Sequence, residues 1–193
     1  MNQANIVFQT WARLGAAALF MSMFAAGAGA ADAGTVDIGT SMPSVKDVQQ
    51  ELYPDDECEQ LKANGFKCMG FKPPVRFSLP SASFKVGSAE LPDGIKHQLD
   101  VFAQALKGKT GSGRAVRIEG HADASGTDVA NDALSLKRAE AARGYLIDKG
   151  VPAEQLKAVG VGSKDLLDEK KPLSPRNRRV VIGREQPPAG TAQ

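Results

Sequence analysis

The chain has 193 residues, of which 42% are hydrophobic and 24% charged, and its 24 Lys and Arg side chains against 22 Asp and Glu give a formal charge of +2. This near-balance excludes the strong basic excess of a dedicated nucleic-acid-binding protein, so we expect no nucleic-acid partner. One four-ligand zinc site would need both Cys and both His, and their spacing does not fit such a site. We therefore expect no metal and no cofactor.

The first residues of the chain have the layout of a secretory signal peptide. Arg13 is the only charged side chain before Asp32, and an uncharged stretch of small and apolar residues follows it and ends in the Ala-x-Ala pattern of Ala28-Gly29-Ala30. We expect residues 1–30 to be cleaved on export. The alternative is an uncleaved membrane anchor, since the stretch is just long enough to span a bilayer. Its high content of Ala and Gly favours cleavage.

Residues 31–74 form a leader segment that is too short to bury a core of its own. Residues 44–53 have a helix-like pattern, and Cys58 and Cys68 follow them. Because an exported protein reaches an oxidising compartment, we expect these two cysteines to form a disulfide. They lack the C-x-x-C spacing of a redox-active pair, so the disulfide is expected to be structural.

A boundary at Pro73-Pro74 opens a regular region, 75–184, in which strand and helix patterns alternate. Its first element is a strand over 75–86, which Pro80 is expected to interrupt. Pro92 then stands at the first position of a helix, whose apolar residues follow at steps of three and four. These residues are Ile95, Leu99, Phe102 and Leu106.

Three strands and one helix complete the region. The strands are expected at 115–119, 156–161 and 180–182. The helix is expected at 136–149, with Gly150 ending it. The order β-α-β-α-β-β predicts an α/β (α+β) fold, with two main helices packed on a mixed four-stranded sheet. Residues 185–193 have no periodicity and are expected to form a flexible tail.

The stretch from Glu119 to Gly150 contains charged residues that suit a ligand with both signs of charge. Ser135 has the properties of a helix N-cap, which would place Arg138 in the first turn. A cation is unfavourable there unless an anion binds beside it, because a helix N-terminus is itself partly positive. Arg138 and the free N–H groups of that turn would then bind a carboxylate or phosphate, and Asp123 would bind an ammonium. Alternatively, Asp123 and Arg138 pair with each other and are purely structural.

The motifs of this region resemble the signature of the OmpA-like family of peptidoglycan-binding domains. They are Gly120-His121-Ala122-Asp123, Gly126, Asn131, Leu134-Ser135, Arg138-Ala139 and, near the end, Asn177-Arg178-Arg179-Val180. The resemblance covers about residues 75–184 and implies the same β-α-β-α-β-β fold. Two positions depart from the family pattern: Ala122 stands where Thr is common, and Ala130 where an aromatic residue is common.

This resemblance implies non-covalent binding to the meso-diaminopimelate of a peptidoglycan stem peptide, whose free end carries an ammonium and a carboxylate. Asp123 would accept hydrogen bonds from the ammonium, and Arg138 would bind the carboxylate. Asn131 would order the loop, and backbone groups near Leu134 and Ser135 would add hydrogen bonds. Structural roles are expected for the other polar motif residues, His121, Asn177, Arg178 and Arg179.

The expected protein is thus an exported envelope protein of the periplasm, associated with the cell wall and placed at the outer membrane. An alternative is a wall-tethered adaptor whose segment 31–74 docks an envelope protein complex. A third hypothesis, a wall-cleaving enzyme, finds no support, because the sequence has no metalloprotease motif, nucleophile elbow or closely spaced carboxylate pair. We therefore expect no enzymatic activity.

Overall fold

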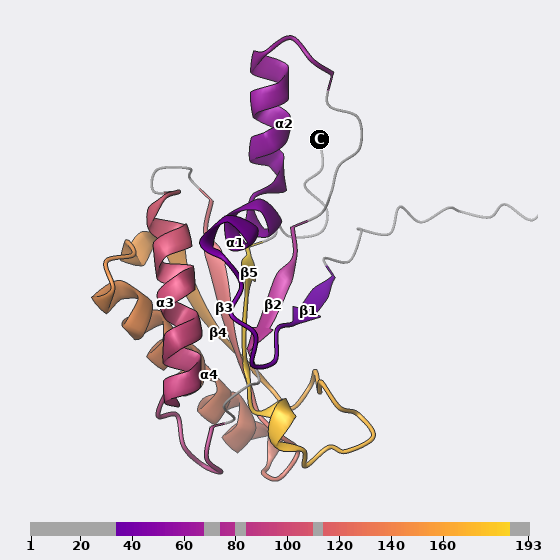
Figure 1. Ribbon diagram of the computed structural model, residues 1–193. Helices are drawn as coiled ribbons and strands as arrows, with labels where there is room; N and C mark the ends of the chain where they lie inside the picture. The colour runs from indigo at the N-terminus through magenta and orange to yellow at the C-terminus, as the bar shows by residue number, and fades with distance from the viewer. Residues whose placement is uncertain (1–33, 68–73, 80–83, 110–113, 186–193) are drawn as a thin grey trace, which may run out of the picture.

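The computed structural model describes residues 34–67, 74–79, 84–109 and 114–185. Within these residues the chain forms a five-stranded mixed sheet in the order β1-β2-β5-β3-β4. Helices α3 and α4 lie side by side against the same side of this sheet (Figure 1). The strands are β1 (Thr35–Asp37), β2 (Arg76–Leu79), β3 (Val116–His121), β4 (Leu156–Gly162) and β5 (Val180–Arg184). The α-helices are α1 (Val45–Leu52), α2 (Pro54–Ala63), α3 (Asp93–Lys107) and α4 (Asp128–Asp148).

The centre of the sheet is the antiparallel pair β3 and β5. Its register places Ile118 opposite Ile182 and Gly120 opposite Val180. Strand β4 runs parallel to β3 on the outer side, and β2 runs antiparallel to β5 on the other. The predicted α+β class with helices on a mixed sheet is therefore confirmed.

Helix α3 buries the apolar face that its sequence predicts. Ile95, Leu99, Phe102 and Leu106 all belong to the core, and the ring of Phe102 meets that of Phe77 on β2 edge to face, with 5.3 Å between ring centroids. The helix begins at Asp93, one residue later than expected, because Pro92 takes the extended conformation of the N-cap. The carboxylate of Asp93 then lies in the first turn, where the helix dipole favours negative charge.

Helix α4 packs very closely on β3 and β4 because both strands present a glycine to it. A Cβ atom on Gly120 would lie 1.8 Å from the carbonyl oxygen of Ser135, and one on Gly160 would lie 2.7 Å from that of Asp132. No larger residue fits between these backbones. The close approach brings the middle of α4 against the end of β3, where the motif residues lie.

Replacing Gly120 with alanine is expected to destabilise the fold by about 2–3 kcal/mol, because the added methyl group must push α4 away from the sheet. Gly144→Ala on the same helix is the matched control, since its Cβ would meet nothing within 4 Å. That control should stabilise the helix by about 0.5–1 kcal/mol. Urea unfolding of both variants measures the difference, and equal midpoints would contradict the close packing.

The described part of the expected leader shares the core of the regular region. Strand β1, which the sequence did not predict, pairs in parallel with β2 and adds a fifth strand to the expected four. The expected helix at 44–53 is present as α1, with Val48 and Leu52 fully buried. The Gln49 side-chain amide donates to the Ala105 carbonyl of α3 at 2.9 Å. A strand of three exposed residues, such as β1, is too short to show the alternation of polar and apolar side chains that predicts a strand. Only the pairing of β1 with β2 therefore defines it.

Several expectations fall on residues outside the described ranges. They are the signal peptide at 1–30, the break at Pro80, and the tail beyond Glu185. Cys58 lies on α2, but Cys68 is outside the described ranges, so the Cys58–Cys68 disulfide stays a prediction. No helix among the described residues is long and apolar enough to cross a bilayer.

Candidate functional site

The motif residues meet at one end of the sheet, where β3 ends and β5 begins (the lower end in Figure 1). The antiparallel register continues past the strands, since the His121 N–H donates to the Arg179 carbonyl at 2.9 Å. This register places the residues that follow β3 beside those that precede β5. Asp123 and Arg178 are brought together in this way, although 55 positions separate them in the sequence.

The Asp123 carboxylate is nearly buried and has partners on both oxygens. Oδ1 accepts hydrogen bonds from the Ser125 N–H at 3.2 Å and from the Ser125 hydroxyl. Oδ2 accepts from Nη1 of Arg178 at 2.7 Å. Burial by itself would raise the pKa of this carboxyl, but the hydrogen bonds from Ser125 and Arg178 outweigh it and hold the pKa below its ordinary value. Asp123 is therefore ionised at neutral pH.

Helix α4 begins eight residues before the predicted start at 136, so the prediction of Ser135 as N-cap is wrong. Thr127 caps the helix, its hydroxyl oxygen accepting from the Ala130 N–H at 3.3 Å, and Asp128 complements the dipole in the first turn. The first two turns of α4 bury few apolar side chains, so their polar sequence predicts a loop and not a helix. Ser135 lies inside the helix, where its hydroxyl donates to the Asp132 carbonyl and accepts from the Gly162 N–H at 2.8 Å. Leu134 precedes it, half-buried in the same turn.

Arg138 consequently lies inside α4 and not in its first turn, and its side chain is fully buried. Nε donates to the Ser88 carbonyl and Nη1 to the His121 carbonyl, both at 2.9 Å. Nη2 reaches the Lys85 carbonyl at 3.4 Å, and the guanidinium stacks over the Phe84 ring at 4.9 Å from its centroid. Burial, with a smaller contribution from the charge of Arg178, lowers the pKa of Arg138 to about 10. The side chain still carries its full charge at neutral pH.

The two sequence-based readings of Asp123 and Arg138 both need correction. The two side chains do not pair with each other, and no carboxylate of the described residues lies within ion-pair distance of Arg138. Nor is Asp123 unpaired, because Arg178 holds it. The site is thus a charge cluster of Asp123, Arg138 and Arg178, in which two guanidinium groups stand against one carboxylate. Such a cluster carries net positive charge and attracts an anion.

Arg178 is the member of the charge cluster that sequence reasoning missed as a site residue. Besides Asp123, it contacts the Phe84 carbonyl through Nε at 2.7 Å. Its side chain remains 12% exposed, whereas that of Arg138 is inaccessible. The signal that could have found it was the antiparallel pairing of the two predicted strands, which places the residue before β5 beside the residue after β3.

Two asparagines order the loops around the cluster. The Asn131 amide donates to the Gly126 carbonyl at 3.4 Å and to the Ser163 hydroxyl at 3.3 Å, and so connects the loop after β3 to the loop after β4. The Asn177 amide donates to the carbonyls of Lys171 and Pro172, and its oxygen accepts from the Asp168 N–H. Each asparagine therefore connects loop segments around the cluster, and the role of Asn131 in ligand binding stays a prediction.

His121 is buried directly beneath the cluster. Nδ1 lies 3.2 Å from the Asp165 carbonyl, which fits an N–H donor, and Nε2 lies 3.6 Å from Oε2 of Glu119. Burial lowers the pKa of His121 below its ordinary value, and the nearby charge of Arg179 acts in the same direction. Its own carbonyl holds Arg138. His121 is therefore a neutral structural residue that helps to fix the guanidinium, in agreement with the sequence-based expectation.

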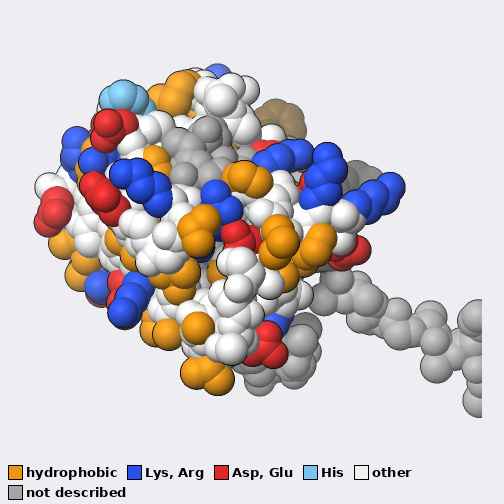
Figure 2. Space-filling model, turned by 90° about the horizontal axis from the view of Figure 1, so that it is seen from below, with side chains coloured by type: hydrophobic (Ala, Val, Ile, Leu, Met, Phe, Trp, Pro, Cys, Tyr) orange, Lys and Arg blue, Asp and Glu red, His pale blue; other side chains and the backbone are white. Residues whose placement is uncertain are grey.

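Figure 2 views the molecule from this end and shows basic, acidic and apolar side chains interspersed over the surface. Three exposed apolar residues come from the segments that surround the cluster: Val86, Val129 and Leu173. The predicted strand does not reach Val86, which is 73% exposed in a turn. Among the described residues no group of His, Cys, Asp and Glu side chains is arranged to hold a metal ion.

Comparison with known proteins gives the family. The sequence model of the OmpA family matches residues 83–179. The chain belongs to the OmpA family. Every residue of the charge cluster lies inside the matched OmpA region, and so do Asn131 and His121.

Relatives of this OmpA-family chain include the peptidoglycan-associated lipoprotein of Pseudomonas aeruginosa, 41% identical over 81 residues that make up 42% of this chain and 46% of that protein. Outer membrane protein A of Serratia odorifera is 33% identical over 103 residues, 53% of this chain and 40% of the relative. The chain thus spans less than half the length of these relatives. The crystal structure of the peptidoglycan-associated lipoprotein from Burkholderia pseudomallei is 31% identical, with a TM-score of 0.48 over 55% of this chain and 94% of that one.

Proposed function

We propose that this OmpA-family protein binds peptidoglycan in the bacterial envelope, non-covalently and through the diaminopimelate of the stem peptide. The observation that carries the proposal is the charge cluster, which places two guanidinium groups beside one carboxylate at the end of the sheet, where the Arg178 side chain remains 12% exposed. The names of the relatives, peptidoglycan-associated lipoprotein and outer membrane protein A, support a location in the periplasm at the outer membrane.

On binding, the ion pair between Asp123 and Arg178 is replaced by two ion pairs with the ligand. The ammonium of the guest takes the place of Arg178 on Asp123, and the carboxylate of the guest pairs with the released Arg178. The buried Arg138 adds positive charge behind the carboxylate, and direct contact with its guanidinium requires the covering turn at 85–88 to shift. A free amino-acid end supplies both signs of charge with the short separation that this exchange needs.

The other proposed site residues support this arrangement from behind. Asn131 fixes the loop that carries Asp123. Ser135 holds the Gly162 N–H, and with Leu134 it forms the turn of α4 that lies on the strand ends. Since their own backbone N–H groups lie within the helix, we assign Leu134 and Ser135 to positioning the pocket.

The affinity of a single site is expected to be weak. A hydrogen bond to a charged group contributes about 1.5–3 kcal/mol. Two or three of them, less the entropy lost on association, give dissociation constants of roughly micromolar to millimolar. A wall polymer repeats its ligand densely, so rebinding retains the protein at the surface.

Sedimentation with purified sacculi tests the proposal. The protein is expected to co-sediment with walls that contain meso-diaminopimelate and to be displaced by free meso-diaminopimelate at millimolar concentration. Walls with lysine at the same position are the control, because lysine has the side-chain ammonium but lacks the carboxylate beside it. Equal binding to both walls would contradict the zwitterion pocket.

The adaptor hypothesis stays a second candidate because of α2. This helix projects from the end of the sheet that lies opposite the cluster (Figure 1), and Leu61 on it and Phe66 after it are exposed. Deleting the whole leader would not test a partner cleanly, since β1 and α1 supply part of the core. Leu61 and Phe66 are therefore the residues to vary when a partner is sought.

A further inference from the structure

A polar cavity lies next to the charge cluster, at the start of α3. It has a volume of about 260 Å³ and is lined by Lys85, Ser88, Glu90, Leu91, Pro92, Asp93 and Lys96. This is below the roughly 300–1,000 Å³ of pockets for drug-sized ligands. A cavity of this size suits about one residue of a peptide.

The cavity and the charge cluster share one turn of the chain. The Ser88 N–H donates to the Lys85 carbonyl at 3.1 Å, and Gly87 between them has a positive φ of 72°. The carbonyls of Lys85 and Ser88 hold the Arg138 guanidinium, while the same two residues line the cavity. A ligand bound at the charge cluster therefore has the cavity beside it, separated by a single turn.

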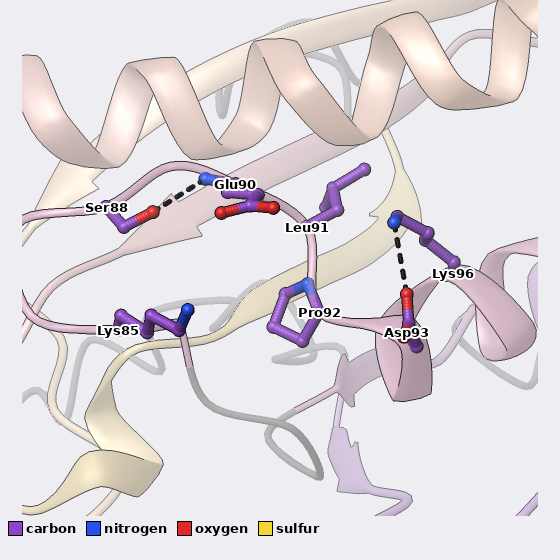
Figure 3. Close-up of a pocket in the computed structure, with 7 residues that line it drawn as sticks. All are labelled: Lys85, Ser88, Glu90, Leu91, Pro92, Asp93 and Lys96. Atoms are coloured by element: carbon purple, nitrogen blue, oxygen red, sulfur yellow. Dashed lines mark hydrogen bonds and ion pairs between the residues drawn. The ribbon is translucent and has the colours of Figure 1, made fainter.

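Four of the side chains that line the cavity are charged. Lys96 and Asp93 satisfy each other through an ion pair of 3.1 Å. Within the described part of the chain, the Lys85 ammonium and the Glu90 carboxylate have no hydrogen-bond or ion-pair partner. Figure 3 shows these two groups on either side of the space beside Pro92, with Leu91 and Pro92 as its apolar lining.

We propose that this cavity is a second subsite, in which Lys85 binds the free carboxylate of the stem-peptide residue that precedes diaminopimelate. That residue is a γ-linked D-glutamate, whose α-carboxylate stays free because its γ-carboxyl forms the peptide bond to diaminopimelate. Glu90 accepts a peptide N–H of the same segment, and Leu91 and Pro92 contact its methylene groups. The inference rests on the proposed function, because the charge cluster must hold the diaminopimelate.

The test compares two ligands by calorimetry: free meso-diaminopimelate and the tripeptide L-Ala-γ-D-Glu-meso-diaminopimelate. Lys85→Ala is expected to weaken tripeptide binding about fivefold, as for one partly exposed charge pair, and to change binding of free meso-diaminopimelate less than twofold. Its backbone carbonyl remains in place for Arg138. Lys85→Arg should restore most of the affinity. Lys46→Ala, which removes another exposed lysine, from α1, is the control and should bind both ligands as the wild type does.

A third ligand isolates the contact itself. The tripeptide in which the glutamate α-carboxylate is an amide should bind the wild type as weakly as the acid binds Lys85→Ala, and the two losses should not add. Unchanged tripeptide affinity in Lys85→Ala, or fully additive losses, would overturn the subsite and leave the proposed function standing if free meso-diaminopimelate still binds. If the wild type binds neither ligand, the proposed function fails and the subsite fails with it.

Discussion

Replacing Arg138 with alanine is expected to lower the free energy of unfolding by about 3–5 kcal/mol, because the change leaves a cavity and removes the donor for several buried carbonyls. The guanidinium is fully buried, holds the carbonyls of Ser88 and His121, and stacks on Phe84. For a chain of this length the melting temperature should fall by about 10–15 °C. The sequence pattern, which places Arg138 at an exposed helix start, predicts instead that this variant keeps its stability.

Arg143→Ala is the matched control for this experiment. Arg143 lies on the same helix and also donates to two carbonyls, those of Leu156 and Ala153, but it is only half-buried. Its loss should cost only about 1 kcal/mol. Thermal unfolding followed by circular dichroism measures both variants, and similar melting temperatures would show that the burial of Arg138 has no energetic consequence.

Replacing Asp123 with asparagine is expected to reduce binding to sacculi at least tenfold while the protein stays folded. The amide oxygen can still accept from Ser125, but the negative charge that would hold the guest ammonium is gone. The ion pair with Arg178 is nearly buried, so its loss should cost about 3 kcal/mol of stability. The bound fraction is measured by sedimentation over a range of protein concentrations, with the melting temperature as the check on folding.

Asp165→Asn provides the control for Asp123→Asn. Asp165 pairs with Arg179, the neighbour of Arg178, at 3.2 Å, and its side chain is half exposed. Removing this charge should leave sacculus binding within twofold of the wild type. If Asp123→Asn also binds normally while folded, the charge cluster is not the wall-binding site.

These two variants separate roles that the sequence alone combines. We propose that a ligand ammonium displaces Arg178 from Asp123, so that the Asp123 charge would serve binding. Arg138 is inaccessible, so its first role is to fasten the end of β3 and the turn at 85–88 to α4. The loss of binding in an Arg138 variant therefore has to be judged against its loss of fold, whereas Asp123→Asn tests binding directly.

The fold could be predicted from sequence wherever apolar periodicity marks an element. The face of α3 with Ile95 and Phe102, and the buried strands β3 and β5, follow from spacing because burial of these side chains supplies most of the driving force. The start of α4 could not be predicted in this way. Its first turns are stabilised by the Thr127 cap and by Asp128 and bury little apolar surface, so they leave no periodic signal.

The amino-acid sequence by itself determined the fold class, the family motifs, and Asp123 and Arg138 as residues of interest. Only the tertiary structure decided their partners, because hydrogen bonds and ion pairs join groups that the sheet register brings together from distant positions. The register between β3 and β5 brings Asp123 next to Arg178. The close approach of α4 to the glycines of β3 and β4 buries Arg138 among backbone carbonyls. Two side chains pair when they lie close together in space, and the number of residues that separates them in the sequence does not give that distance.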